Sequence, residues 1–139
     1  NLPFESDMSY SIFISRKSAQ STEEASGYIV QDNLTAPASG KAKIRFTNQV
    51  TDAPSVDVKM KGGAAIFSNR AFPYMSDFIS VDPAVSYTLE IHETGNSAVK
   101  IELPAFNLEA NKIYTLYING LWDGTGGNDA LAAHVITNK

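Results

Sequence analysis

The sequence predicts an all-β domain, either a sandwich or a barrel, built from about nine short strands. Three observations lead to this prediction. Apolar and polar residues alternate with a period of two in several runs, turn residues separate these runs at short intervals, and no run has the length of a stable helix. A length of 139 residues with a hydrophobic fraction of 43% is sufficient for one domain with a buried core.

The alternating runs predict strands with one buried and one solvent-facing side. They are residues 43–47, with Ile44 and Phe46 inward, residues 55–60, residues 87–93, with His92 on the outward polar side, and residues 99–103. Two segments rich in aromatic and β-branched residues, 9–14 and 113–118, are predicted as central strands. Residues 130–137 are predicted as the final strand, because Val135, Ile136 and Thr137 disfavour a helix.

Glycine-containing turns mark the breaks between strands. Gly95-Asn96, between two alternating runs, predicts a β-hairpin. Residues 123–127 (DGTGG) predict a turn before the last strand. The best helix candidate, residues 21–26, is too short to be more than a loop or a single turn.

The chain contains a partial internal repeat. Residues 4–14 (FESDMSYSIFI) resemble residues 108–118 (LEANKIYTLYI), and residues 27–33 resemble residues 133–139. Tyr10 corresponds to Tyr114 and Tyr28 to His134, with offsets of 104 and 106 residues (114 − 10 and 134 − 28). We therefore divide the chain into residues 1–39, a hairpin segment that resembles the end of a preceding module and docks on the main domain, and residues 40–139, the β-sandwich module.

Two interpretations of the N-terminal segment stay open. In one, the chain is the tail of a tandem array, and these strands have lost their original partners. In the other, they complete a single sandwich by adding to the edge of a sheet. Because a lone hairpin is unstable in water, we expect both strands to dock on the module as sheet strands.

Composition and charge exclude several functions. The net charge is −4 and there is no cysteine, which rules out disulfide bonds, thiolate chemistry and cysteine-based zinc sites. The densest basic cluster, Lys41, Lys43 and Arg45, is too small for a nucleic-acid interface, and we interpret it as a solvated strand face. Arg45 is expected to point outward and to pair with Asp57 on an adjacent strand.

No catalytic residue, metal site or cofactor is predicted. His92 and His134 are the only histidines, and neither has the spacing of a metal motif or of a nucleophile with its base. Both are interpreted as ordinary strand residues. The carboxylates are scattered over loops and outward strand faces, without the clustered pair that a glycosidase uses. The chain is therefore predicted not to be an enzyme.

The candidate ligand-binding residues lie mainly in the loop of residues 122–129. Asp123, Asn128 and Asp129 supply oxygen atoms on a glycine-rich loop, which is the chemistry of a calcium site, although the EF-hand spacing is absent. Trp122 could stack on a sugar ring, and Tyr74 is the second candidate exposed aromatic residue. A hairpin loop with glycines at positive φ explains the same loop without a ligand.

Several segments occur together in the order of a known family. They are residues 44–58 (IRFTNQVTDAPSVDV), 67–72 (FSNRAF), 76–78 (SDF), 86–89 (SYTL) and 108–115 (LEANKIYT). Over about residues 40–138 the chain resembles the bacterial domain-of-unknown-function family numbered 4397. The resemblance implies an immunoglobulin-like antiparallel β-sandwich on an exported bacterial protein, often a lipoprotein or a multidomain surface protein with tandem copies. It implies neither a reaction nor a ligand. The family more often has Ser-Pro before Asp-Ala-Pro, where this chain has Val50-Thr51.

The function expected from the sequence is a non-enzymatic module of the cell surface or periplasm with a structural, spacer or adhesion-type role. One alternative is a carbohydrate-binding module of a surface glycan-utilisation system, and another is a calcium-stabilised protein–protein interaction domain. The expected partners are a glycan or another surface protein, and no nucleic acid. No apolar run is long enough for a membrane helix, and an export signal or lipid anchor would precede Asn1.

Overall fold

The computed structural model describes residues 4–15 and 25–139, and in these residues the protein is all-β. The predicted fold class is confirmed, but the described strands number eleven rather than nine. Two of them, β6 (Tyr74–Met75) and β7 (Ile79–Val81), are too short to show a period of two, which is why the sequence pattern did not reveal them. Residues 21–24 of the predicted loop lie outside the described residues.

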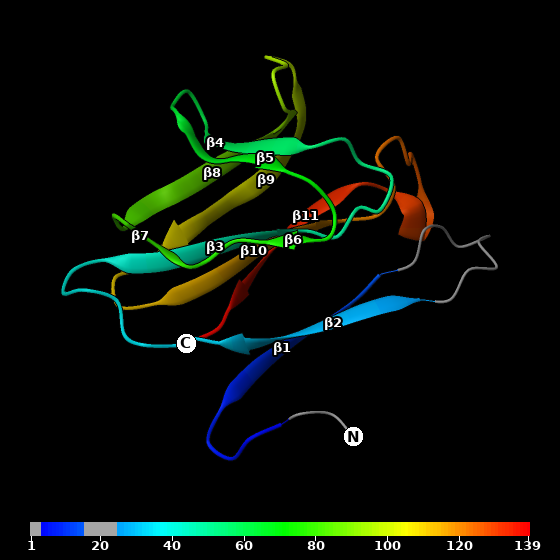
Figure 1. Ribbon diagram of the computed structural model, residues 1–139. Coiled ribbons are helices and arrows are strands. Elements are labelled where there is room, and N and C mark those ends of the chain that lie inside the picture. The colour runs from blue at the N-terminus through cyan, green and yellow to red at the C-terminus, as the bar shows by residue number, and fades with distance from the viewer. Residues whose placement is uncertain (1–3, 16–24) are drawn as a thin grey trace.

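The strands form three sheets (Figure 1). The first is the hairpin of β1 (Ser9–Ser15) and β2 (Ser26–Asp32). The second, called here the β3 sheet, has the order β11-β10-β3-β6, and β7 also pairs with β3. Its longer strands are β3 (Ala42–Asn48), β10 (Ile113–Asn119) and β11 (Ala132–Thr137). The third, the β8 sheet, has the order β5-β4-β8-β9, with β4 (Val56–Met60), β5 (Ala65–Arg70), β8 (Ala84–Glu93) and β9 (Val99–Leu108).

The β3 sheet and the β8 sheet pack face to face as a sandwich. Their inward side chains make one apolar core, in which Phe46 of β3 and Phe67 of β5 stack at 6.0 Å between ring centroids. Strand β3 pairs in parallel with β10, whereas the other pairings are antiparallel. The predicted hairpin at Gly95 is confirmed: it joins β8 to β9, and the Asn96 N–H donates to the Glu93 carbonyl.

The hairpin β1–β2 joins neither of the other two sheets. The expectation that it docks as sheet strands is therefore wrong. The edges of the other two sheets are β11, β6 with β7, β5 and β9, and the hairpin pairs with none of these strands. The hairpin lies instead against the outer face of the β3 sheet, where side chains rather than backbone groups make the contacts (Figure 1).

A single 3₁₀ turn, η1 (Gly127–Asp129), precedes β11. No helix in residues 4–15 and 25–139 is long and apolar enough to cross a membrane.

Candidate functional site

Buried and half-buried polar side chains form the contact between the hairpin and the sandwich, and we call this contact the hairpin joint. It consists of Ser11, Ser15, Tyr28, Asp32, Arg45, Thr47, Gln49 and Thr115. Arg45 and Thr47 lie at alternate positions on the outer face of β3, and Gln49 is the first residue after that strand. The prediction of a solvated face is wrong for Arg45, which is only 2% exposed beneath the hairpin, whereas Lys41 and Lys43 stay partly exposed.

The Arg45 guanidinium is the centre of the joint. Its Nη1 lies 2.7 Å from Asp32 Oδ1 in an ion pair, its Nη2 donates to Ser11 Oγ at 2.7 Å, and its Nε donates to Thr115 Oγ1 at 2.9 Å. The guanidinium carbon also lies 4.5 Å from the centre of the Phe78 ring. One side chain of β3 therefore binds β1, β2 and β10 at once, and both members of the ion pair are almost fully buried.

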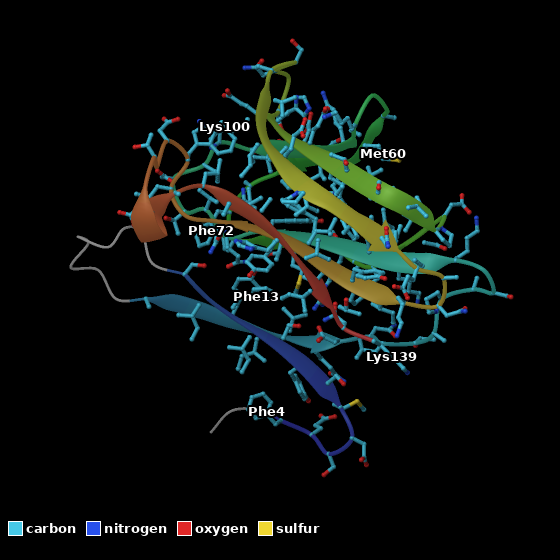
Figure 2. All side chains as sticks on the ribbon, turned by 180° about the vertical axis from the view of Figure 1, so that it is seen from behind. Phe4, Phe13, Met60, Phe72, Lys100 and Lys139 are labelled. Carbon is cyan, nitrogen blue, oxygen red and sulfur yellow. The ribbon has the colours of Figure 1, made fainter. Side chains whose placement is uncertain are left out.

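A second polar cluster lies at the other end of the hairpin. Gln49 Nε2 donates to the Tyr28 hydroxyl and to Thr47 Oγ1, and Ser15 Oγ donates to Gln49 Oε1 at 2.7 Å. The Tyr28 and Thr47 hydroxyls lie 2.8 Å apart. The Tyr28 ring stacks on Phe13, which Figure 2 shows on the side of the hairpin that faces the sandwich. The hairpin is thus held at two separated points, which fixes its direction as well as its position.

The predicted pair between Arg45 and Asp57 is wrong, because the two residues lie in different sheets. Asp57 Oδ1 instead accepts the Asn69 N–H and the Thr94 hydroxyl, both at 2.9 Å. It thereby supports Asn69, which has a φ of 57°, beside an irregularity in the pairing of β4 with β5. The chain turns ahead of β4 at residues 50–53, where the Ala53 N–H donates to the Val50 carbonyl at 3.2 Å.

The environment of Asp57 predicts a loss of stability in acid. Burial raises the pKa of the Asp57 carboxyl, but the hydrogen bonds from Asn69, Thr94 and Gly95 and the nearby Lys59 cation together lower it by more, so the pKa lies below the ordinary value of 3.8. Stabilisation from such a group is complete above pH 3.8 and is lost as the pH falls below it. When the pH falls from about 6 to about 3, we expect the free energy of unfolding to decrease more in the native chain than in the Asp57→Asn variant. The difference between the two decreases is expected to be less than about 1 kcal/mol. Urea unfolding at both pH values measures this, and parallel losses would contradict it.

Trp122 lies in the loop between β10 and η1 and acts there as an anchor. Its backbone N–H donates to Asp52 Oδ1 at 2.9 Å, and its side chain is half-buried against the core. Lys100 Nζ lies 4.8 Å from the centre of the indole ring and 2.6 Å from Asp123 Oδ1. The ring therefore borders a surface hollow of about 460 Å³, but a lysine already occupies part of its face.

The predicted calcium ligands are not assembled by the described residues. Asp123 is paired with Lys100, and the Asp129 carbonyl accepts the Leu121 N–H at 3.0 Å. The side chain of Asn128 lies outside the described part of the structure. No group of three or more Asp, Glu or His side chains placed to hold a metal ion occurs among the described residues.

Tyr74 does not join Trp122 in one site. It lies on β6 opposite Asn48, and its ring receives the Arg70 guanidinium at 4.5 Å. The hollow beside Trp122 is lined from β9 and from the segment that connects β10 with β11, and Tyr74 is not part of its lining.

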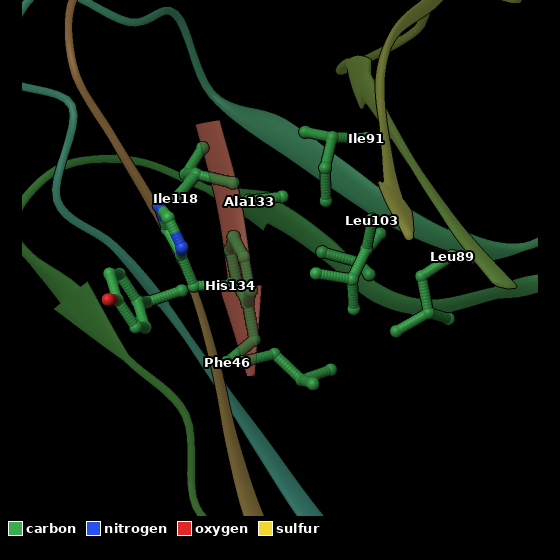
Figure 3. Close-up of a pocket in the computed structure, with 10 residues that line it drawn as sticks. Phe46, Leu89, Ile91, Leu103, Ile118, Ala133 and His134 are labelled. Carbon is green, nitrogen blue, oxygen red and sulfur yellow. The ribbon is translucent and has the colours of Figure 1, made fainter. Parts of the chain in front are cut away.

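The two histidines lie in different sheets, and neither faces the other. His92 was predicted on the polar side of its strand, yet it is only 3% exposed, with Nε2 lying 3.3 Å from Glu90 Oε2. His134 stacks on Tyr117 at 4.7 Å and contacts Asn119 Oδ1 at 3.0 Å. It also borders a cavity between the sheets (Figure 3). That cavity measures about 10 Å³, at the lower limit for one water molecule.

The loop around Trp122 depends on a glycine. A Cβ at Gly124 would lie 1.8 Å from the Asp129 carbonyl oxygen, so Gly124→Ala forces the loop to move. We expect a loss of about 1–3 kcal/mol, the usual cost of overpacking. Gly126→Ala is the control, because a Cβ there meets nothing within 4 Å and the backbone is extended, with a φ of −168°. Chemical denaturation compares the two variants, and equal midpoints would contradict the prediction.

These features define a class of protein: a small β-sandwich module whose N-terminal hairpin is packed on the outside of one sheet. The family described as "Domain of unknown function (DUF4397)" matches residues 1–59 and 48–139. The chain belongs to this family, as the resemblance in its sequence indicates.

Comparison with solved structures and curated proteins adds little to this assignment. The C-terminal domain of AlgF from P. aeruginosa is similar over 71% of this chain and 99% of that chain, with 19% identity and a TM-score of 0.48. No curated protein matches the chain significantly.

Proposed function

We propose that this chain is a non-enzymatic structural module of an exported bacterial protein, and that it holds the segments before and after the hairpin joint in a fixed orientation. The observation that carries the proposal is the buried ion pair between Arg45 and Asp32, whose side chains are 3% and 5% exposed. Two charges removed from water are tolerated only when their geometry is held closely. A hairpin that moved freely on the sandwich would separate them repeatedly.

The arrangement of the joint supports a spacer role more than a binding role. Each Arg45 nitrogen contacts an oxygen atom within the protein, so the cation is not free to bind an external anion. The proposed location, at the cell surface or in the periplasm and in some relatives on a lipoprotein, follows the family resemblance. Fractionation of cells of the source bacterium with an antibody to the chain tests the location, and recovery in the cytoplasm would contradict it.

Distance measurements between two spin labels test the rigid joint. The chain has no cysteine, so Ser9→Cys in β1 and Ser68→Cys in β5 introduce the labels at two exposed positions. We expect a single narrow distance distribution in the native chain and a broad one after Arg45→Met. A broad distribution before that substitution would mean that the hairpin is not fixed on the sandwich, and the proposal would fail.

The second candidate is a carbohydrate-binding module, and the hollow of about 460 Å³ beside Trp122 favours it. A panel of plant, host and microbial glycans in a thermal-shift assay tests this candidate, because a ligand at 100 times its Kd stabilises by about 2.7 kcal/mol. Trp122 packs on the core, so Asp123→Ala and Thr125→Ala are the better variants for locating the site. A glycan shift that both variants leave unchanged would place binding elsewhere.

A further inference from the structure

The outward face of the hairpin is apolar and exposed. Tyr10, Ile12 and Ile14 alternate along β1 on the side opposite Ser11 and Ser15, which contact the sandwich. Ile12 is 53% exposed and Ile14 is 74% exposed. Phe4 and Met8, just before β1, are about half exposed, and Figure 2 places Phe4 on the side of the hairpin away from the sandwich. A strand face of this composition normally lies inside a sandwich.

The hairpin β1–β2 is a structural duplicate of the hairpin β10–β11. With the offsets of 104 and 106 residues, six residue pairs of one hairpin coincide with six pairs of the other. They run from Tyr10–Gln31, equivalent to Tyr114–Thr137, to Ser15–Ser26, equivalent to Asn119–Ala132. A shift of one residue in the pairing register of either hairpin would have removed this agreement.

The side-chain contacts repeat as well, beginning at the turn before each hairpin. The Glu5 N–H donates to the Tyr10 hydroxyl at 3.0 Å, and the Glu109 N–H donates to the Tyr114 hydroxyl at 3.1 Å. Between these partners the backbone turns through a residue of positive φ in both copies, 63° at Asp7 and 65° at Asn111.

The repetition continues on the strands. Ser11 donates to Asp32 at 2.8 Å, and the equivalent Thr115 donates to Asn138 at 2.7 Å. The stacked rings of Phe13 and Tyr28 are likewise equivalent to the stacked rings of Tyr117 and His134. Hydrogen bonds, backbone angles and ring stacking thus all indicate one structural unit that occurs twice.

Burial is the property that differs between the two copies. Leu116 and Ile118, on the inward face of β10, are 2% and 0% exposed because β3 lies beside them and the β8 sheet covers them. Ile12 and Ile14 are their equivalents, and nothing in the described residues covers them to a similar extent. Phe4 is equivalent to Leu108, the last residue of β9, which is 2% exposed.

We infer that the outward face of β1–β2 is the inner face of a second sandwich, whose remaining strands belong to another copy of this domain encoded upstream in the same polypeptide. That copy supplies a strand equivalent to β3, parallel to β1, and a sheet equivalent to the β8 sheet over Ile12 and Ile14. Because Phe4 is equivalent to Leu108, the last residue of β9, Phe4 would end the strand of that copy that is equivalent to β9. The hairpin joint is then the contact between successive copies, so the inference rests on the proposed function in this one respect.

A tandem chain tests the inference. Residues 40–107 are placed directly before residue 4 of residues 4–139, so that Phe4 takes the place of Leu108 in the added copy. We expect the added segment to fold and to bury Ile12 and Ile14, with slow amide hydrogen exchange in the added strands. Added strands that exchange as fast as an unfolded chain would overturn the inference.

Substitution of Ile12 gives the sharper readout. Ile12→Asp leaves the melting temperature of the native 139-residue chain unchanged, but abolishes folding of the added copy in the tandem chain. Val85→Asp in the original module is the matched control, because Val85 is 83% exposed, and it changes neither chain. An Ile12→Asp tandem chain that still folds fully would overturn the inference.

Two further outcomes separate the alternatives. A native chain that dimerises in solution, and becomes monomeric after Ile12→Asp, would mean that a second copy of the whole chain covers this face, and the inference of an upstream copy would be wrong. The spin-label distances in the native chain report on the joint alone. A narrow distribution there, together with an unfolded added segment, would overturn this inference and leave the proposed function standing.

Discussion

Replacing Arg45 with alanine lowers the free energy of unfolding by about 3–5 kcal/mol, the cost expected when one member of a buried ion pair is removed. Asp32 then keeps a charge that is 5% exposed and has lost its cationic partner, and the Ser11 and Thr115 hydroxyls lose a bond each. Urea unfolding of the native chain and of the variant measures the loss. A loss below about 1 kcal/mol would mean that water reaches the joint.

The double variant Arg45→Met, Asp32→Leu distinguishes the effect of an unpaired charge from the effect of losing the contact itself, because it removes both charges and keeps side chains of similar size. Because a buried ion pair replaced by apolar residues of similar volume is often neutral or stabilising, we expect this variant to recover most of the loss. Lys43→Ala is the matched control on the same strand, since Lys43 Nζ reaches only the exposed carbonyl of Thr35 at 2.7 Å. If the double variant were as unstable as Arg45→Ala, the instability would not come from the unpaired charge of Asp32. The ion pair itself would then stabilise the folded chain.

The joint also shows what the alternation of residues could and could not predict. Ile44 and Phe46 were correctly placed in the core, because period-two alternation assigns residues to the two faces of a strand. It does not say whether the second face is covered. Arg45, on that face, was therefore predicted as solvated, although the hairpin buries it. The same limit applies to His92, which is buried on the outer face of β8.

One signal in the sequence could have located the joint. The repeat aligns Ser11 with Thr115 and Asp32 with Asn138, and these are the side chains that surround Arg45 or bond to its partners. An Asp or Asn that occurs at the same place in both hairpins, together with an unexplained arginine on a strand, indicates a polar contact at that place. The sequence alone could not show that the hairpin packs on the outer face of the β3 sheet rather than at a sheet edge.

The candidate residues chosen for their chemistry turned out to lie in ordinary structural contacts. Trp122 anchors its loop on Asp52, Asp123 binds Lys100, and Tyr74 receives Arg70. Exposed aromatic residues and glycine-rich loops are found both in binding sites and in loops that merely close a sheet. Only the partners of each side chain distinguish these cases, and partners distant in sequence are not visible in a single sequence.

Leu116→Ala lowers the free energy of unfolding by about 2–5 kcal/mol, while Ile12→Ala at the equivalent place in the duplicate hairpin changes it by less than about 0.5 kcal/mol. The reason is burial alone, since the strands have the same register and Leu116 is 2% exposed against 53% for Ile12. Truncating Leu116 leaves a cavity between two sheets, whereas truncating Ile12 removes atoms that already contact water.

The comparison is measured by urea unfolding of both variants under one set of conditions, with equal slopes as evidence that each variant still unfolds in a single transition. A large effect at Ile12 would show that its side chain is buried in the isolated chain, by a dimer or by a different position of the hairpin. A small effect at Leu116 would mean that the two sheets are not closely packed there. The expected difference follows from one fact, that two copies of the same hairpin have their apolar faces in different surroundings.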